Sequence, residues 1–409
     1  MPKLPLSVRS PAEPATAASA SRDVLPVWDL SDLYAGTDAP ALSADLDAAA
    51  DAARAFATDW RGKLEGFARA PQGGERIAEA MRAYESLQDK LGRVISYAGL
   101  LYATDNTNPV NAKFYGDMQE RVTAISTDLL FFTLELNRLS DADMATALTS
   151  PALARYAPWL RDLRAMQPYQ LSDELETLLH EKSVSGRGAW NRLYDETLSR
   201  LTFDIDGEAK PLEAALSRLS DRDGKKREEA AHALAKTFEA NIGTLTLVTN
   251  TLAKDKEIED RWRKFADIAD SRHIANCVEA PVVAALVDAV RQSYPQLSHR
   301  YYAMKAKWMG LERLEYWDRN APLPDADDAF IPWGQARDTV LDAYRGFTPQ
   351  MADIAEQFFD KGWIDAPLRP GKATGAFAHP TVPSAHPYVL VNYQGKTRDV
   401  MTLAHELGH

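Results

Sequence analysis

The last five residues of the sequence, His405-Glu406-Leu407-Gly408-His409, form a pattern that can bind and activate a metal ion. On a helix, residues four positions apart share one face, so the imidazoles of His405 and His409 can reach a single cation. Glu406 stands next to the first histidine, where its carboxylate can take a proton from a metal-bound water. The pattern is typical of zinc peptidases. The alternative is a surface helix end whose histidines are only solvated.

The residues before the motif predict the elements that position it. The run 387–393, Pro-Tyr-Val-Leu-Val-Asn-Tyr, is rich in aromatic and β-branched residues and indicates a strand. Residues 394–397 are predicted to turn, and Asp399 or Thr402 to cap a helix that carries the motif. We expect the edge of that strand to bind an extended peptide through its backbone.

Composition excludes several classes of function. The chain has 409 residues, 45% hydrophobic and 26% charged, which is ordinary for a globular protein with two or three domains. The net charge of −12 argues against nucleic acid as a partner. Cys277 is the single cysteine, so an internal disulfide is excluded and a reducing, cytoplasmic location is expected. Cys277 is expected to be buried. No apolar run approaches membrane-spanning length, so no membrane partner is expected.

The periodicity of apolar residues predicts a mainly helical chain with one change of texture. Residues 1–24, rich in Ala, Ser and Pro, are predicted to be a disordered tail. A first helical domain is predicted over 25–200 and a second domain over 201–409. The boundary is placed where Leu201–Gly207 alternates and closes on Asp-Gly, which predicts a strand and a tight turn. A short strand-like piece is expected at 315–318. Helices are predicted over 42–60, 77–102, 109–139, 211–219, 225–270, 333–346 and 349–359.

The chain resembles the oligoendopeptidase F group of the thimet-oligopeptidase-like zinc metallopeptidases. The likeness extends from residue 28 over nearly the whole chain and consists of an ordered set of short segments. These are Trp28–Tyr34, Gly188–Trp190, Tyr316–Asp318, Ala321–Leu323, Trp363–Asp365, Lys372–Phe377, Pro387–Tyr388, Asn392–Tyr393 and Asp399–His409. Many zinc peptidases share the terminal motif, but the ordered upstream set is specific to this group.

The resemblance implies a multi-helix shell around a deep channel, with a small β-sheet next to the metal-binding helix. It implies one Zn²⁺ per complete active site, His405 and His409 as ligands, and Glu406 as general base and proton shuttle. It implies short peptides as substrates and a cytoplasmic oligopeptidase activity. Residues that match the group's motifs are expected to contact substrate, namely Gly375, Ala376, Phe377, Tyr388 and Asn392.

In the group, a third zinc ligand, a glutamate, follows the motif on a downstream helix. A catalytic zinc site normally has three protein ligands and a water. Residues 201–409 are therefore expected to be the N-terminal portion of an incomplete catalytic domain, and the chain a fragment with little activity alone. The alternative is a catalytically inactive helical module that binds peptides or a protein partner.

Overall fold

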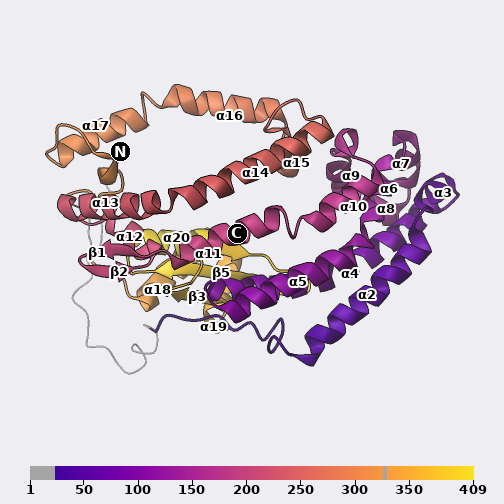
Figure 1. Ribbon diagram of the computed structural model, residues 1–409, viewed down its shortest axis with the longest axis horizontal. Coiled ribbons are helices and arrows are strands. Elements are labelled where there is room, and N and C mark those ends of the chain that lie inside the picture. The colour runs from indigo at the N-terminus through magenta and orange to yellow at the C-terminus, as the bar shows by residue number, and fades with distance from the viewer. Residues whose placement is uncertain (1–23, 326–328) are drawn as a thin grey trace.

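A computed structural model describes residues 24–325 and 329–409. The predicted disordered tail lies outside the described residues, apart from Val24. Figure 1 shows an elongated, mainly helical molecule, with the N-terminal helices at one end and a small sheet, covered by the last helices, at the other. The predicted mainly α fold is confirmed.

The N-terminal part is a layered array of helices built on three long ones. The predicted apolar stripe of the first helix is confirmed, because its members from Leu42 to Trp60 are all buried. The helix predicted over 109–139 is wrong in its extent, since it breaks at Asp128 and Leu129. The hydroxyls of Ser126 and Thr127 both donate to the carbonyl of Thr123, and such bonds compete with the helical ladder. The elements are α2 (Pro40–Trp60), α3 (Leu64–Arg69), α4 (Gly73–Thr104), α5 (Pro109–Thr127), α6 (Leu130–Arg138), α7 (Asp141–Ala147), α8 (Pro151–Ala154), α9 (Ala157–Arg164), η1 (Gln167–Tyr169) and α10 (Asp173–Lys182).

The middle of the chain begins with a hairpin and continues as a long helical arm. Asp206 and Gly207 both have positive φ, 56° and 78°, so the predicted tight turn is confirmed. The piece at 315–318 is a 3₁₀ turn and the expected strand is wrong, because Asp318 accepts the backbone N–H of Glu315 and closes a turn. The elements are α11 (Arg187–Arg200), β1 (Phe203–Ile205), β2 (Glu208–Lys210), α12 (Leu212–Arg218), α13 (Gly224–Ala240), α14 (Ile242–Arg263), α15 (Asp270–Ala275), α16 (Ala280–Ser293), α17 (Ser298–Trp308) and η2 (Tyr316–Asp318).

The C-terminal part places a three-stranded sheet beside the last helix. The elements are α18 (Trp333–Phe347), α19 (Pro349–Asp360), β3 (Ile364–Pro367), β4 (Phe377–His379), β5 (Tyr388–Tyr393) and α20 (Thr397–Gly408). The predicted strand is β5, which lies in the middle of the order β3-β5-β4. It pairs parallel with β3 and antiparallel with β4. The expectation that the edge of β5 binds a peptide is therefore wrong, because both its edges are paired. Within the described residues, the outer edge of β4 pairs with no strand.

The largest hydrophobic core joins the two ends of the described chain. Trp28, Leu46 and Tyr97 pack in one cluster with Tyr388 and Leu403. A second core binds α2 to the helices up to α9, and a third, smaller core unites β1, α12 and α13. The predicted domain boundary at residue 201 stays a prediction, and the largest core contains residues from both sides of it.

Two further features bear on the expectations. Cys277 is exposed and adopts a positive φ of 50°, so its predicted burial is wrong. Its place in the short turn between α15 and α16 leaves it outside every core. None of the helices in the described part of the chain has the length and apolarity that a membrane crossing requires.

Candidate functional site

The metal motif lies on α20, which two contacts hold firmly against the fold. The Asp399 carboxylate accepts the backbone N–H groups of Gln394, at 2.8 Å, and Lys396, at 3.0 Å, across the turn from β5. The N-cap residue of α20 is Lys396, so the predicted cap position at Asp399 or Thr402 is wrong; Asp399 stabilises the same helix start as the third residue of the helix, in a capping box. Farther along, the hydroxyl of Tyr344 on α18 donates to the carbonyl of Ala404. The capping box therefore fixes the start of α20, and α18 holds its C-terminal half.

The two motif histidines converge at the end of α20. Their Nε2 atoms lie 3.2 Å apart, with the ring planes at 85°. Two zinc–nitrogen bonds of normal length, at a tetrahedral angle, place the nitrogens roughly 3.3 Å apart. The spacing of His405 and His409 therefore fits two ligands of one ion. The same spacing also permits one imidazole to donate a hydrogen bond to the other in metal-free protein.

The pair does not form a complete three-ligand site by itself. Among the described residues, no three His, Cys, Asp or Glu side chains gather in a way that could hold a metal ion. Both histidines are exposed at the end of the helix. A catalytic zinc site normally has three protein ligands, of which the pair His405 and His409 would supply two.

Glu406 faces a large cavity beside the helix. The cavity has a volume of about 1010 Å³ and lies between α12, the loop 319–322, residues 375–376, the end of β5 and one face of α20. Glu406 is 9% exposed and lines it together with Thr402. Its carboxylate makes no hydrogen bond or ion pair within the part of the chain that the structure describes, so it is available to a ligand in the cavity.

Three of the five predicted substrate-contact residues meet in this cavity: Gly375, Ala376 and Asn392. The Asn392 side chain donates to the carbonyls of Ala373, at 3.1 Å, and Gly375, at 2.9 Å, and so holds the loop before β4. Gly375 has a φ of +76°, and a Cβ built on it would meet no atom within 4 Å. Its backbone lies open to the cavity for lack of a side chain.

The other two predicted contact residues point elsewhere. Tyr388 is fully buried, its hydroxyl donates to the carbonyl of Asp29 at 2.8 Å, and its ring meets Trp28 edge-on. The predicted contact of Tyr388 with substrate is therefore wrong. Burial raises the pKa of this tyrosine well above its ordinary value, with Asp32 and Asp29 adding to the rise. Phe377 also packs on Trp28, with 6.4 Å between ring centroids.

A glutamate that the sequence did not single out closes the cavity on one side. Glu213, on α12, accepts the backbone N–H of Gly375 at 2.7 Å. Lys396, before α20, donates to the carbonyl of Ser217 on the same short helix at 2.6 Å. These two hydrogen bonds join α12 to the sheet side. The pairs lie 162 and 179 residues apart in sequence, so no local spacing could have revealed them.

A buried lysine ties the strands under the cavity. The ammonium of Lys372 lies 2.6 Å from the Asp365 carboxylate, and both side chains are fully buried. The ammonium also donates to the carbonyls of Asp365, Pro367 and Val391. Burial lowers the pKa of Lys372 to about 8, against the opposing effect of Asp365. Lys372 therefore fixes the ends of β3 and β5 directly before the loop that contains Gly375.

Two family models match this chain, each in a different segment. A family model described as oligopeptidase F matches residues 135–203, and one described as peptidase family M3 matches residues 217–409. The chain is 22% identical over 361 residues to oligopeptidase PepF of Bacillus subtilis, covering 86% of this chain and 52% of PepF. It is 25% identical to group B oligopeptidase PepB of Streptococcus agalactiae, covering 82% of this chain and 56% of PepB. The chain spans just over half the length of these relatives.

Solved structures agree with the fold. PZ peptidase A, solved with an inhibitor, superposes with a TM-score of 0.71 at 15% identity, covering 90% of this chain and 61% of that one. Oligoendopeptidase F from Enterococcus faecium superposes with a TM-score of 0.60 at 18% identity, covering 78% and 62%. The M3 match includes α20, the sheet and the cavity wall apart from Glu213 and Leu216. On this evidence, the chain belongs to the oligoendopeptidase F family of the M3 peptidases.

Proposed function

We propose that this chain carries the metal motif of a zinc-dependent endopeptidase that hydrolyses short peptides. The observation that carries the proposal is the 3.2 Å approach of the His405 and His409 Nε2 atoms beside Glu406, whose carboxylate faces the cavity. Both relatives compared above are named oligopeptidases, which supports short peptides as the substrates. A cytoplasmic location, expected from the single cysteine and the resemblance, is part of the proposal.

The chemistry divides between the ion and the residues of the chain. A bound zinc ion supplies acidification of a water molecule and polarisation of the scissile carbonyl. Glu406 accepts the proton of the attacking water and delivers it to the leaving amine. Glu213 and Asn392 engage the N–H and the carbonyl of Gly375, so the backbone groups left for an extended peptide are those on the free edge of β4. Asn392 and Lys372 hold those groups in place.

Metal binding by the histidine pair is tested by titrating the metal-free chain with Zn²⁺ in a calorimeter. We expect one site in the wild type and none after His405→Ala or His409→Ala. His273→Ala is the matched control, because His273 lies on α15, away from the motif. Zinc binding that survives the double change His405→Ala and His409→Ala would refute the assignment of the ligands.

The role of Glu406 is tested with a quenched fluorescent peptide in the presence of zinc. We expect Glu406→Gln to retain zinc and to lose whatever hydrolysis the wild-type chain shows, because the amide cannot accept the proton. Equal rates in the two proteins would show that Glu406 is not the base. The titration and the rate measurement separate loss of the metal from loss of the base.

A second function, a catalytically inactive module that binds peptides, is favoured by one observation. The histidine pair lacks a third His, Cys, Asp or Glu beside it among the described residues. Under this alternative the chain binds a labelled peptide in the cavity but releases no product, with or without zinc. Product release that depends on Glu406 would exclude it.

A further inference from the structure

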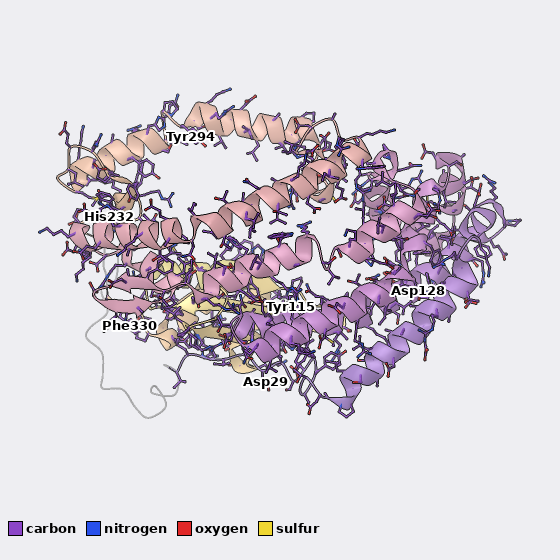
Figure 2. All side chains as sticks on the ribbon, in the orientation of Figure 1. Asp29, Tyr115, Asp128, His232, Tyr294 and Phe330 are labelled. Atoms are coloured by element: carbon purple, nitrogen blue, oxygen red, sulfur yellow. The ribbon has the colours of Figure 1, made fainter. Side chains whose placement is uncertain are left out.

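One wall of the cavity that Glu406 lines is the loop 319–322, and buried charges hold this loop. Asp318, at the end of η2, is 4% exposed, and its carboxylate accepts two hydrogen bonds from the guanidinium of Arg227 on α13, at 2.6 and 3.2 Å. The third guanidinium nitrogen of Arg227 donates to the carbonyls of Asp221 and Arg222. The ring of Trp317 meets His232 edge-on, with 5.6 Å between centroids, and Figure 2 shows His232 on α13.

The same loop is held from a second side. The ammonium of Lys305, on α17, donates to the backbone carbonyl of Arg319 at 2.8 Å, and Lys305 is only 2% exposed. Burying three charged groups costs free energy that apolar packing would not cost. The arrangement of Arg227, Asp318 and Lys305 does give the loop one fixed path. The residue whose backbone they fix is Arg319.

The Arg319 side chain lies in the cavity without a partner. It is exposed, lines the cavity together with Asn320, and makes no hydrogen bond or ion pair among the described residues. The neighbouring charges are engaged: Glu213 accepts from Gly375, and Asp399 accepts from the turn before α20. A guanidinium in a cavity that a peptide can enter is a strong ligand for a carboxylate, because it donates two parallel hydrogen bonds.

We propose that Arg319 binds a carboxylate of the peptide and thereby determines which short peptides the cavity accepts. The carboxylate is either the free C-terminus of the peptide or an acidic side chain, since the two present the same chemistry. The inference rests on the proposed function, because it takes the cavity beside Glu406 as the peptide-binding site. Arg227, Asp318 and Lys305 are positioning residues that hold the backbone of Arg319.

The test measures the affinity of the 409-residue chain for fluorescently labelled peptides by anisotropy. One short peptide carries both an acidic side chain and a free C-terminus, a second has the C-terminus amidated, and a third has the acidic side chain replaced by its amide. The variants are Arg319→Gln, Arg319→Lys, Arg398→Gln and, as matched control, Arg272→Gln, which changes an exposed arginine on α15 that does not line the cavity. Arg398 lines the cavity from the first turn of α20, so its variant tests whether the other guanidinium there binds the carboxylate instead.

We expect loss of one carboxylate to weaken wild-type binding by about tenfold, as for one charge-assisted pair. The affected peptide identifies the source of the carboxylate. Arg319→Gln should bind all three peptides equally, Arg319→Lys should restore part of the difference, Arg398→Gln should keep the preference for the carboxylate, and the control Arg272→Gln should behave as wild type. Wild-type affinities that ignore both carboxylates, or a preference removed by Arg398→Gln instead, would overturn the inference.

The measurement separates this inference from the proposed function. Anisotropy records binding without hydrolysis, and Glu406→Gln should keep the full preference for the carboxylate. A carboxylate preference that depends on Arg319, in a chain that neither binds zinc nor cleaves peptides, would contradict the peptidase proposal alone. Hydrolysis that depends on Glu406 but shows no such preference would contradict the role of Arg319 alone.

Discussion

Replacing Asp399 should loosen the helix that carries the metal motif. One oxygen of this carboxylate accepts the N–H groups of Gln394, at 2.8 Å, and Lys396, at 3.0 Å. Asp399→Ala removes the single acceptor of both hydrogen bonds and leaves two donors without this partner around the start of α20. Asp399→Asn keeps an acceptor oxygen in the same place and removes only the charge.

The expected magnitudes follow from those contacts. A hydrogen bond to a charged group contributes about 1.5–3 kcal/mol, so loss of two sharing one oxygen should cost about 2–4 kcal/mol. The charge of an acidic residue in the first turn contributes about 0.3–1 kcal/mol by its interaction with the helix dipole. Asp399→Asn should therefore cost about 1 kcal/mol, most of it from weaker hydrogen bonds and the lost dipole interaction.

Amide hydrogen exchange of peptides from α20 measures the loss of stability in this helix directly. With about 1.4 kcal/mol for each factor of ten, Asp399→Ala should lower the protection of α20 at least about thirtyfold, and Asp399→Asn about fivefold. Peptides from α9 are the internal control, because its buried residue Leu160 packs in the second core, which contains no residue of α20, and they should exchange as in the wild type. The His405–His409 pair should bind zinc more weakly in Asp399→Ala than in Asp399→Asn.

Two results would refute this reasoning. Equal protection of α20 in the alanine and asparagine variants would mean that the two hydrogen bonds do not hold the helix. Unchanged protection in both would mean that packing of the buried residues Val400 and Leu403 is sufficient.

Three further predictions concern the rest of the fold. Burial raises the pKa of Glu176, but the hydrogen bonds from Arg263 and from the Leu171 N–H, together with the charge of Arg263, outweigh it and leave the pKa below its ordinary value. The contribution of Glu176 is therefore present above pH 4.5 and lost as the pH falls through the folded-state value. Glu176→Gln should cost about 1–3 kcal/mol at pH 7 and flatten the acid limb of a urea-denaturation series; an unchanged acid limb would contradict this. Gly395→Ala should lower the melting temperature, because its backbone has a φ of +80° and the new Cβ would lie 2.2 Å from a neighbouring phenyl ring. Gly346→Ala is the matched control: the space around Gly346 is open, and this substitution should raise the melting temperature. Tyr388→Phe should cost about 1 kcal/mol of stability and leave peptide affinity unchanged, and a selective loss of affinity would return Tyr388 to the binding site.

Local patterns in the sequence predicted those parts of the structure that depend on neighbouring residues. The apolar spacing of α2, the Asp-Gly turn at 206–207 and the pairing of His405 with His409 each arise within a few residues. The break after Thr127 was missed because hydroxyl groups that bond back to the helix leave the apolar periodicity intact.

The rest depends on contacts between distant segments. β5 is central because it pairs with β3 and β4, which come from earlier segments of the chain. The pattern of the strand alone could not reveal that both edges of β5 are paired. The burial of Tyr388 is decided by Trp28, and the wall of the cavity by Glu213 and Arg319. Contacts between such distant segments leave no periodic signal in the sequence. The family resemblance indicated which positions belong to the motifs, but not where their side chains point.

The bond between the Tyr388 hydroxyl and the carbonyl of Asp29 joins residues 359 positions apart. A ribosome that synthesises this chain therefore releases the segment around Asp29 long before the strand that covers it exists. Until then Trp28 has no sheet to pack against, and its apolar surface stays accessible to chaperones. Such long-range closure slows folding, since the loop must form before the contact stabilises it. The sheet beside the His405–His409 pair can consequently close on Trp28 only after β5 has been synthesised.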